Sequence, residues 1–318
     1  LSAVQNSVSN TVAVMEASTG ALLGALIPVE IGPINSLVPL IGAAMSQGAV
    51  WVVNGDGAGR AVPELPQTTF TGGAQLAPCP AVLASDASTL VDLESAVLGA
   101  STAARVETLA GGVVAGFGGY SGIAMWPSNA GNGFALSGSY IPGTLEQARG
   151  LGQFLLQAAT PPATAAVADV ITMITGRPAS AVVTNFFITS VTQSTSSASL
   201  DSGIIRLDNT QDPSLSTETH YLYNLNENLI MYSSASVAPD VIAPDSICYY
   251  SESTGRGFSN ASDDLALYFD AATGKSTGQM VSVIAVQTAP QLYNTPGVVA
   301  SFAGLLRNMG YAGAMPSA

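Results

Sequence analysis

The chain has 318 residues, of which 47% are hydrophobic and 9% are charged, and its formal net charge is −13. A soluble domain usually carries about 25% charged residues, so Ser, Thr, Asn and Gln or neighbouring subunits must cover much of the surface. Only 8 residues are Lys or Arg, which excludes nucleic-acid binding by a basic face, because phosphate contacts depend on these residues.

The N-terminal segment predicts an arm. Residues 1–45 are small and apolar with scattered prolines, and we expect them to pack on the rest of the protein or on a neighbour. Since the chain begins with Leu1, we expect a processed or trimmed product, from which an upstream basic arm could have been removed. No apolar stretch reaches the roughly 20 residues of a spanning helix, so we expect no membrane partner.

The middle of the chain predicts strands and helices in turn. In chain order we expect strands at 49–53 and 68–71, a helix at 88–98, strands at 105–117 and 133–141, and helices at 145–158 and 164–175. The last two helices are ended by Pro161-Pro162 and by Gly176, which are typical stop signals.

The C-terminal part predicts mainly strands, at 181–191, 220–222, 229–232, 247–250, 264–269 and 280–286. The clearest pair is the last one, joined by a turn at 273–276 with hairpin chemistry. Alternation along 264–269 predicts a half-buried strand with Leu267 at its middle inward position.

These elements predict a mainly β fold, an antiparallel eight-stranded jelly-roll β-sandwich with helical insertions in its connections. We expect the jelly roll to span 46–290, between the N-terminal arm at 1–45 and a C-terminal arm at 291–318.

No catalytic motif is complete. The single histidine, His220, stands in no known signature, and we expect it at a strand edge or on the surface. Residues 119–122 lack the last glycine of a nucleophile elbow, and residues 274–276 lack the first glycine of a P-loop. The glycines of segment 55–59 predict a turn. We therefore expect no enzyme.

Two features concern metals and thiols. Asp208 and Asp212 lie in a polar segment predicted to be a loop, and their carboxylates could bind Ca²⁺; solvated loop carboxylates are the simpler alternative. Cys79 and Cys248 show no metal-ligand spacing, and we expect two unpaired thiols.

Residues 105–140 resemble the central strands of coat proteins of small icosahedral RNA viruses, of the nodavirus and tombusvirus kind. The resemblance rests on Arg105, on 112–114 (GVV), on 126–128 (WPS) and on 134–140. The acidic-capped segment 263–269, the closing segment 280–287 and residues 290–293 are similar as well. The resemblance implies a jelly-roll shell domain with its loops and helical insertion at subunit contacts.

The resulting hypothesis is a viral capsid subunit, a homo-oligomer of many copies located in the virion. Any genome contact would be made through the missing basic arm, and Asp208 with Asp212 would bind Ca²⁺ between subunits. The alternative is a secreted or cell-surface β-sandwich that binds a glycan or a protein partner.

Overall fold

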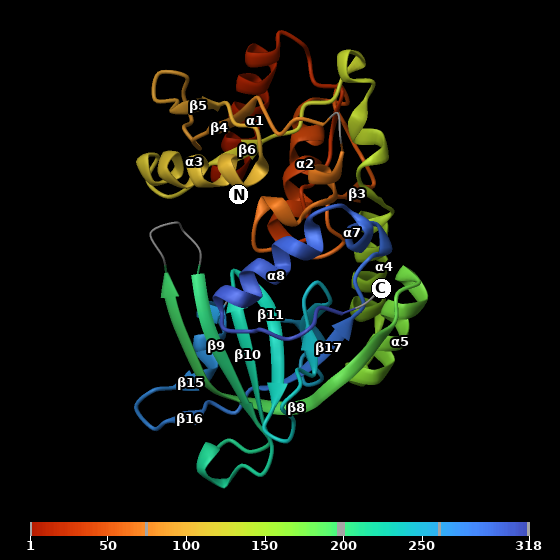
Figure 1. The fold of residues 1–318 in the computed structure, drawn as a ribbon, viewed down its shortest axis with the longest axis vertical. Coiled ribbons are helices and arrows are strands. Elements are labelled where there is room, and N and C mark those ends of the chain that lie inside the picture. Colours follow the sequence, from red (N-terminus) through yellow and green to blue (C-terminus); the bar gives the residue numbers. More distant parts are fainter. Residues whose placement is uncertain (1, 74–75, 196–200, 260–261, 317–318) are drawn as a thin grey trace. The chain divides into compact units, whose positions relative to one another are not determined.

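The computed structural model describes residues 2–73, 76–195, 201–259 and 262–316. Within it the chain divides into two compact units (Figure 1): unit 1 comprises Leu1–Leu145 and Asn294–Ser301, and unit 2 comprises Glu146–Tyr293 and Phe302–Ala318. Residues 1–45, expected as an arm, lie within unit 1. The structure is 36% helical and 25% strand, so the fold is mixed α/β and the prediction of a mainly β protein is wrong.

Unit 1 combines helices with three small sheets. Its main helices are α1 (Ser2–Thr19), α2 (Pro33–Met45) and α3 (Ala103–Gly116). Its sheets are the antiparallel set β5 (Ser95–Leu98), β4 (Ala81–Ala84) and β6 (Gly122–Ala124), the parallel pair β1 (Ala25–Leu26) and β2 (Trp51–Val52), and the antiparallel pair β3 (Gly55–Asp56) and β7 (Ile141–Pro142). Val8, Thr11 and Met15 form the buried face of α1 at helical spacing, and α1 packs against β4 and β6.

Helix α3 corrects the strand predicted at 105–117. Thr102 caps the helix, because its side chain accepts a hydrogen bond from the Arg105 amide. The buried residues Ala103, Val106 and Ala110 then recur at helical spacing. The Gly-Gly-Val-Val stretch inside this segment favours β structure locally, but the cap and the buried face outweigh it.

Other short predictions in unit 1 also change. The predicted helix at 88–98 is instead an irregular segment that ends in strand β5. The run at 68–71 begins at Thr68, directly after the 3₁₀ turn η1 (Leu65–Gln67), and continues into the 3₁₀ turn η2 (Thr69–Gly72). Segment 133–141 mostly forms the 3₁₀ turn η4 (Ala135–Gly138) before β7.

Unit 2 is built on a single antiparallel sheet of eight strands, in the order β12-β11-β10-β9-β8-β17-β13-β14. The strands are β8 (Ala179–Thr195), β9 (Asp201–Asp208), β10 (Thr219–Leu225), β11 (Glu227–Ser233), β12 (Val241–Ile242), β13 (Ser246–Ser251), β14 (Arg256–Gly257) and β17 (Met280–Val286). The predicted strands at 181–191, 220–222, 229–232, 247–250 and 280–286 all lie within these and are confirmed.

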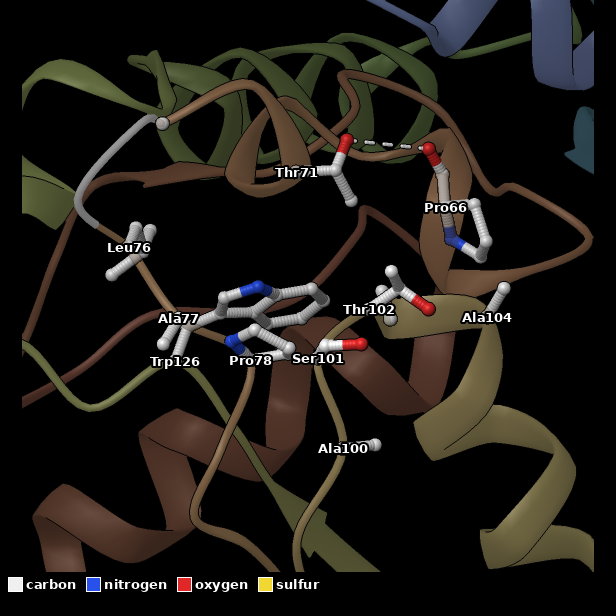
Figure 2. Close-up of a pocket in the computed structure, with 12 residues that line it drawn as sticks. Pro66, Thr71, Leu76, Ala77, Pro78, Ala100, Ser101, Thr102, Ala104 and Trp126 are labelled. Atoms are coloured by element: carbon white, nitrogen blue, oxygen red, sulfur yellow. Dashed lines mark hydrogen bonds between the residues drawn. The ribbon is translucent and has the colours of Figure 1, made fainter.

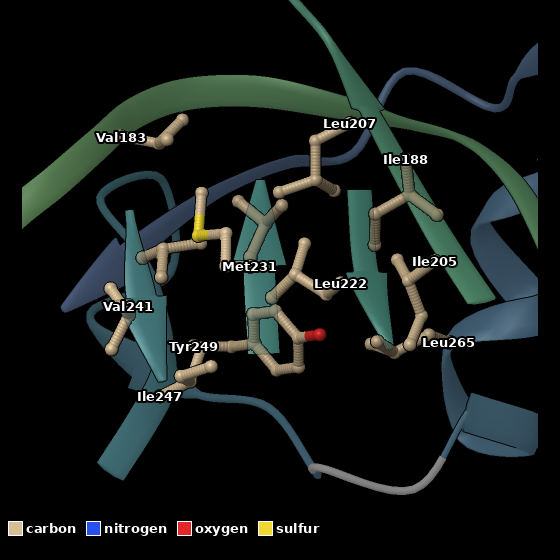
Figure 3. Packing of buried hydrophobic residues seen from close by; sticks show 12 residues of the cluster. Val183, Ile188, Ile205, Leu207, Leu222, Met231, Val241, Ile247, Tyr249 and Leu265 are labelled. Atoms are coloured by element: carbon tan, nitrogen blue, oxygen red, sulfur yellow. The ribbon is translucent and has the colours of Figure 1, made fainter. Parts of the chain in front are cut away.

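The sheet curls on itself instead of pairing with a second sheet. Strands β11 and β13 are not neighbours in the ladder, yet the Asn228 amide donates to the Ile247 carbonyl at 3.3 Å and the Tyr249 hydroxyl donates to Asn228 Oδ1 at 3.1 Å. The enclosed face buries Ile188, Leu207, Leu222 and other apolar side chains, which point toward one another in Figure 3. The two-sheet jelly roll is therefore not what the chain forms.

Two helices cover the opposite face of the same sheet. They are α4 (Thr144–Gln157) and α5 (Thr164–Thr175), both as predicted. Val167 and Ile171 of α5 pack with Tyr250 and Ile284 of the sheet. The preceding residue of each strand, Tyr249 or Val283, faces the enclosed apolar core instead, because successive side chains of a strand point to opposite faces.

The C-terminal elements correct the assignment of Leu267. Segment 264–269 forms the end of α6 (Ser262–Leu265), the turn η6 (Ala266–Tyr268) and the start of β15 (Phe269–Asp270). Leu265 is 1% exposed and Leu267 is 76% exposed, so Leu267 points to solvent and Leu265 enters the core. A short hairpin joins β15 to β16 (Lys275–Ser276). The predicted pairing of 264–269 with 280–286 is wrong, because β17 pairs with β8 and β13 instead.

The chain closes with α7 (Pro290–Asn294) and α8 (Val298–Asn308). Across the described ranges, no helix has both the length and the apolar character needed to cross a bilayer.

Candidate functional site

A pocket of about 520 Å³ lies in unit 1, around the side chain of Trp126 (Figure 2), and we refer to it as the Trp126 pocket. Its size falls in the range of small-molecule sites. Its described lining residues come from the η1–η2 region, the segment before β4, and the start of α3, together with Trp126: Pro66, Thr71, Gly73, Leu76, Ala77, Pro78, Ala100, Ser101, Thr102, Ala103, Ala104 and Trp126.

Trp126 is the most unusual lining residue. It is 3% exposed, and its φ of 51° places a bulky side chain in a conformation that such residues rarely adopt. Its indole N–H makes no hydrogen bond within the described part of the chain. In Figure 2 the ring lies across the middle of the pocket, with its nitrogen on the edge turned toward Thr71. The indole nitrogen is not one of the fully buried side-chain atoms that lack a partner, so its N–H is open to the pocket and available to a ligand.

The glycine-rich segment 55–59 supports the Trp126 ring through Phe70. Phe70 packs against Trp126 with ring centroids 5.1 Å apart. A Cβ on Gly57 would lie 2.6 Å from the Phe70 ring, so only glycine allows this approach. Asp56 Oδ2 accepts hydrogen bonds from the amides of Ala58 at 3.0 Å and Gly59 at 2.8 Å. Of the segment predicted to be a turn, Gly55 and Asp56 form strand β3, and the chain bends directly after them.

The first turn of α3 supplies polar groups to the same pocket. Ala103 and Ala104 occupy the first two helical positions after the cap Thr102. Their amides have no partner within the helix and make no other hydrogen bond in the described part of the chain. The Ser101 hydroxyl is also without a partner there. These groups, together with the positive end of the helix dipole, favour an acceptor-rich ligand.

Glu107, one turn further along α3, links the helix to the opposite wall. Its carboxylate accepts a hydrogen bond from the Leu65 amide at 2.8 Å, and Leu65 precedes the lining residue Pro66. Burial raises the pKa of Glu107 to about 7; the hydrogen bond from Leu65 opposes this increase, and the nearby charge of Glu64 adds to it. Glu107 therefore ties together two walls of the pocket and titrates near neutral pH.

The predicted metal ligands lie in unit 2. Asp208 is fully buried at the end of β9, not in a loop, and accepts hydrogen bonds from Thr219 at 2.5 Å, from Thr189, and from Arg206 Nη2 at 3.0 Å. Arg206 Nε also lies 2.8 Å from the carboxylate, as an ion pair. Burial alone would raise the pKa of Asp208, but these hydrogen bonds outweigh it and the pKa is lowered.

Asp212 pairs with Lys275 at 2.7 Å and accepts from the Ser214 amide and hydroxyl, and these hydrogen bonds lower its pKa to about 2. Both predicted carboxylates thus already have cationic partners within the chain. Among the described residues, no group of three or more His, Cys, Asp or Glu side chains could hold a metal ion. Calcium binding between subunits stays a prediction.

His220 is buried, not at a strand edge or on the surface. It lies on β10, which pairs with β9 and β11, and it is 4% exposed. Its two ring nitrogens lie 3.2 Å from Asp240 and 3.1 Å from Glu218. This arrangement holds the imidazole between two carboxylates and brings no nucleophile to it. No disulfide joins the two cysteines, as predicted.

Sequence reasoning missed the Trp126 pocket because it assigned a strand to the start of α3. The signal was present: Thr102 is a good cap, and Ala103, Val106 and Ala110 follow at helical spacing. Residues 126–128 entered only through the resemblance to coat proteins, and nothing local shows that Trp126 lines one pocket with the start of α3.

Two family models match the chain. The S-Me-THD-like N-terminal domain matches residues 2–95, and the S-Me-THD-like C-terminal domain matches residues 101–303. No curated protein matches. A solved structure of a Chromobacterium violaceum protein from a structural genomics programme is similar at a TM-score of 0.74 and 24% identity, covering 98% of this chain and 78% of that one. That likeness shows the fold alone.

These matches overturn the capsid hypothesis. No viral coat-protein family is among them, so the resemblance to nodavirus and tombusvirus coat proteins, the structural role in a shell and the virion location are wrong. The structural reason is visible at Arg105: the segment that resembled a coat-protein strand is helix α3. The alternative of a glycan- or protein-binding β-sandwich gains no support either.

Proposed function

This chain belongs to the S-Me-THD-like family, and we propose that its unit 1 binds a small organic molecule in the Trp126 pocket. The observation that carries the proposal is the indole N–H of Trp126: the side chain is 3% exposed, yet its N–H makes no hydrogen bond in the described part of the chain and borders a pocket of about 520 Å³. A positive φ at a bulky buried residue adds support, because such strain gathers at ligand sites.

The position of the pocket in the chain also supports binding. Residues 66–78 of its lining come from the segment matched by the N-terminal family domain, and residues 101–126 come from the segment matched by the C-terminal one, with Ala100 just before it. Ligand sites are common where domains meet. None of the described lining residues is acidic, basic, His or Cys, so we propose binding without chemistry on the ligand.

The two tryptophans allow a direct test, because Trp51 and Trp126 both lie in unit 1. Trp51 is 75% exposed, so Trp51→Phe leaves Trp126 as the only tryptophan at little cost. Benzoate and benzamide, two planar probes of nearly equal shape, are titrated separately into this variant. We expect at least one of them to change the Trp126 fluorescence saturably.

A blocking variant supplies the control. Ser101 is exposed and lines the pocket, so Ser101→Phe added to Trp51→Phe should fill the space and abolish the saturable change. Leu109→Phe, at an exposed position of the same helix, should leave it intact. The proposal fails if neither probe gives a saturable change, or if the Ser101→Phe protein titrates like its parent.

A further inference from the structure

Resting on the proposed binding pocket, we infer that its ligand is a small organic acid, whose carboxylate sits at the N-terminus of α3 beside the indole of Trp126. The inference concerns the chemical class of the ligand, which the existence of a pocket does not decide.

Three N–H donors without a partner in the described chain belong to residues that line the pocket. The Ala103 and Ala104 amides at the start of the 14-residue helix α3 have no partner in the described chain, and a helix N-terminus favours an anion. The Trp126 indole is an independent donor, because it comes from a buried side chain that lies outside helix α3. An indole N–H cannot accept a hydrogen bond, so the ligand group that meets it must be an acceptor.

The charges around the pocket do not oppose an anion. No described lining residue is a carboxylate. Two acids near the pocket in the sequence are held outside its lining by hydrogen bonds: Glu64 accepts from the Gln67 side chain at 3.2 Å, and Glu107 accepts from the Leu65 amide at 2.8 Å. Arg105, the third residue of α3, is exposed and forms no ion pair in the described part of the chain, so its charge adds to the positive end of the helix.

The rest of the described lining suits the organic part of such an acid. It is formed by Pro66, Leu76, Pro78 and alanine side chains, with the face of Trp126. A compact inorganic anion would leave this apolar surface without contact, whereas an organic acid covers it while its carboxylate meets the amides.

The backbone allows one amide donor to be removed with the helix intact. Proline is well tolerated at the first helical position and has no N–H. Thr102, which precedes Ala103, has φ −137° and ψ 151°, the extended conformation that a residue before proline requires. Ala103→Pro therefore deletes one donor, and Ala103→Val adds similar bulk while keeping the N–H.

The test compares benzoate with benzamide in the Trp51→Phe protein, by Trp126 fluorescence. We expect benzoate to bind about tenfold more tightly or better, because charge-assisted hydrogen bonds are worth that much. Ala103→Pro should remove most of this preference by weakening benzoate, and Ala103→Val should retain it. Equal loss of benzoate binding in both variants would show that bulk, not the amide, was responsible, and would overturn the inference.

A competition experiment tests the inference without the proline variant, and therefore remains valid if that variant does not fold. Acetate should displace benzoate from the Trp51→Phe protein, whereas acetamide should not. If benzamide binds as tightly as benzoate, or if acetamide competes as well as acetate, the ligand is not an acid, although the proposed pocket stands. If neither aromatic probe binds at all, the proposed function fails as well.

Discussion

Replacing Glu107 by Gln tests whether the carboxyl between α3 and η1 is held in its protonated form. In the native protein burial raises the pKa of Glu107 from 4.5 to about 7, so the folded state holds this proton more tightly than the unfolded chain does. Its contribution to stability is therefore fully present below pH 4.5 and is lost as the pH rises toward 7. Since one pKa unit corresponds to about 1.4 kcal/mol, this contribution is about 3 kcal/mol at most.

Glutamine keeps an oxygen that accepts from the Leu65 amide but cannot ionise. We expect Glu107→Gln to lie within about 1 kcal/mol of the wild type at pH 5 and to exceed its free energy of unfolding by up to about 3 kcal/mol at pH 8. Urea unfolding followed by tryptophan fluorescence measures unit 1, which contains Trp51 and Trp126.

Glu146→Gln is the matched control. Glu146 is an exposed residue of α4 whose contact with Arg149 spans 3.8 Å, and exposed pairs contribute little, so this variant should follow the wild type at both pH values. Parallel stability profiles for Glu107→Gln and wild type between pH 5 and pH 8 would refute the assignment of a raised pKa to Glu107.

The remaining predictions concern unit 2 and the thiols. Leu265→Ala should lower the free energy of unfolding by roughly 2–5 kcal/mol in urea unfolding, because Leu265 is 1% exposed. Leu267→Ala should change it by less than about 0.5 kcal/mol, because Leu267 is 76% exposed. The reverse order would show that the core face is wrongly assigned. Asp208→Asn should destabilise unit 2 by roughly 1–3 kcal/mol, since the buried carboxylate loses its charge-assisted hydrogen bonds, including the one from the partly exposed Arg206. Circular dichroism melts at pH 7 that coincide with wild type would contradict this. Intact mass should not change on reduction, because Cys79 and Cys248 form no disulfide; a gain of two hydrogens would show otherwise.

Much of unit 2 was predictable from the sequence because its signals are local and consistent. The predicted strand at 280–286 is β17. The helices predicted at 145–158 and 164–175 form with nearly the predicted bounds, because proline and glycine end them. The number of sheets was not predictable. Alternation along a strand is the same in a two-sheet sandwich and in one curled sheet, and only contacts such as that between Asn228 and Tyr249 distinguish them.

Unit 1 and its pocket were decided by tertiary structure. The sequence determined that the chain is poor in charge, that it bends within the glycine-rich segment 55–59, and that no complete catalytic motif is present. It did not determine that Phe70 rests on that segment, that Trp126 packs on Phe70, or that the start of α3 opens beside the indole. Each of these groups is unremarkable in its own segment. They become a site only because chain folding brings segments 66–78, 100–104 and 126 together, and such long-range contacts leave no period or motif in the sequence.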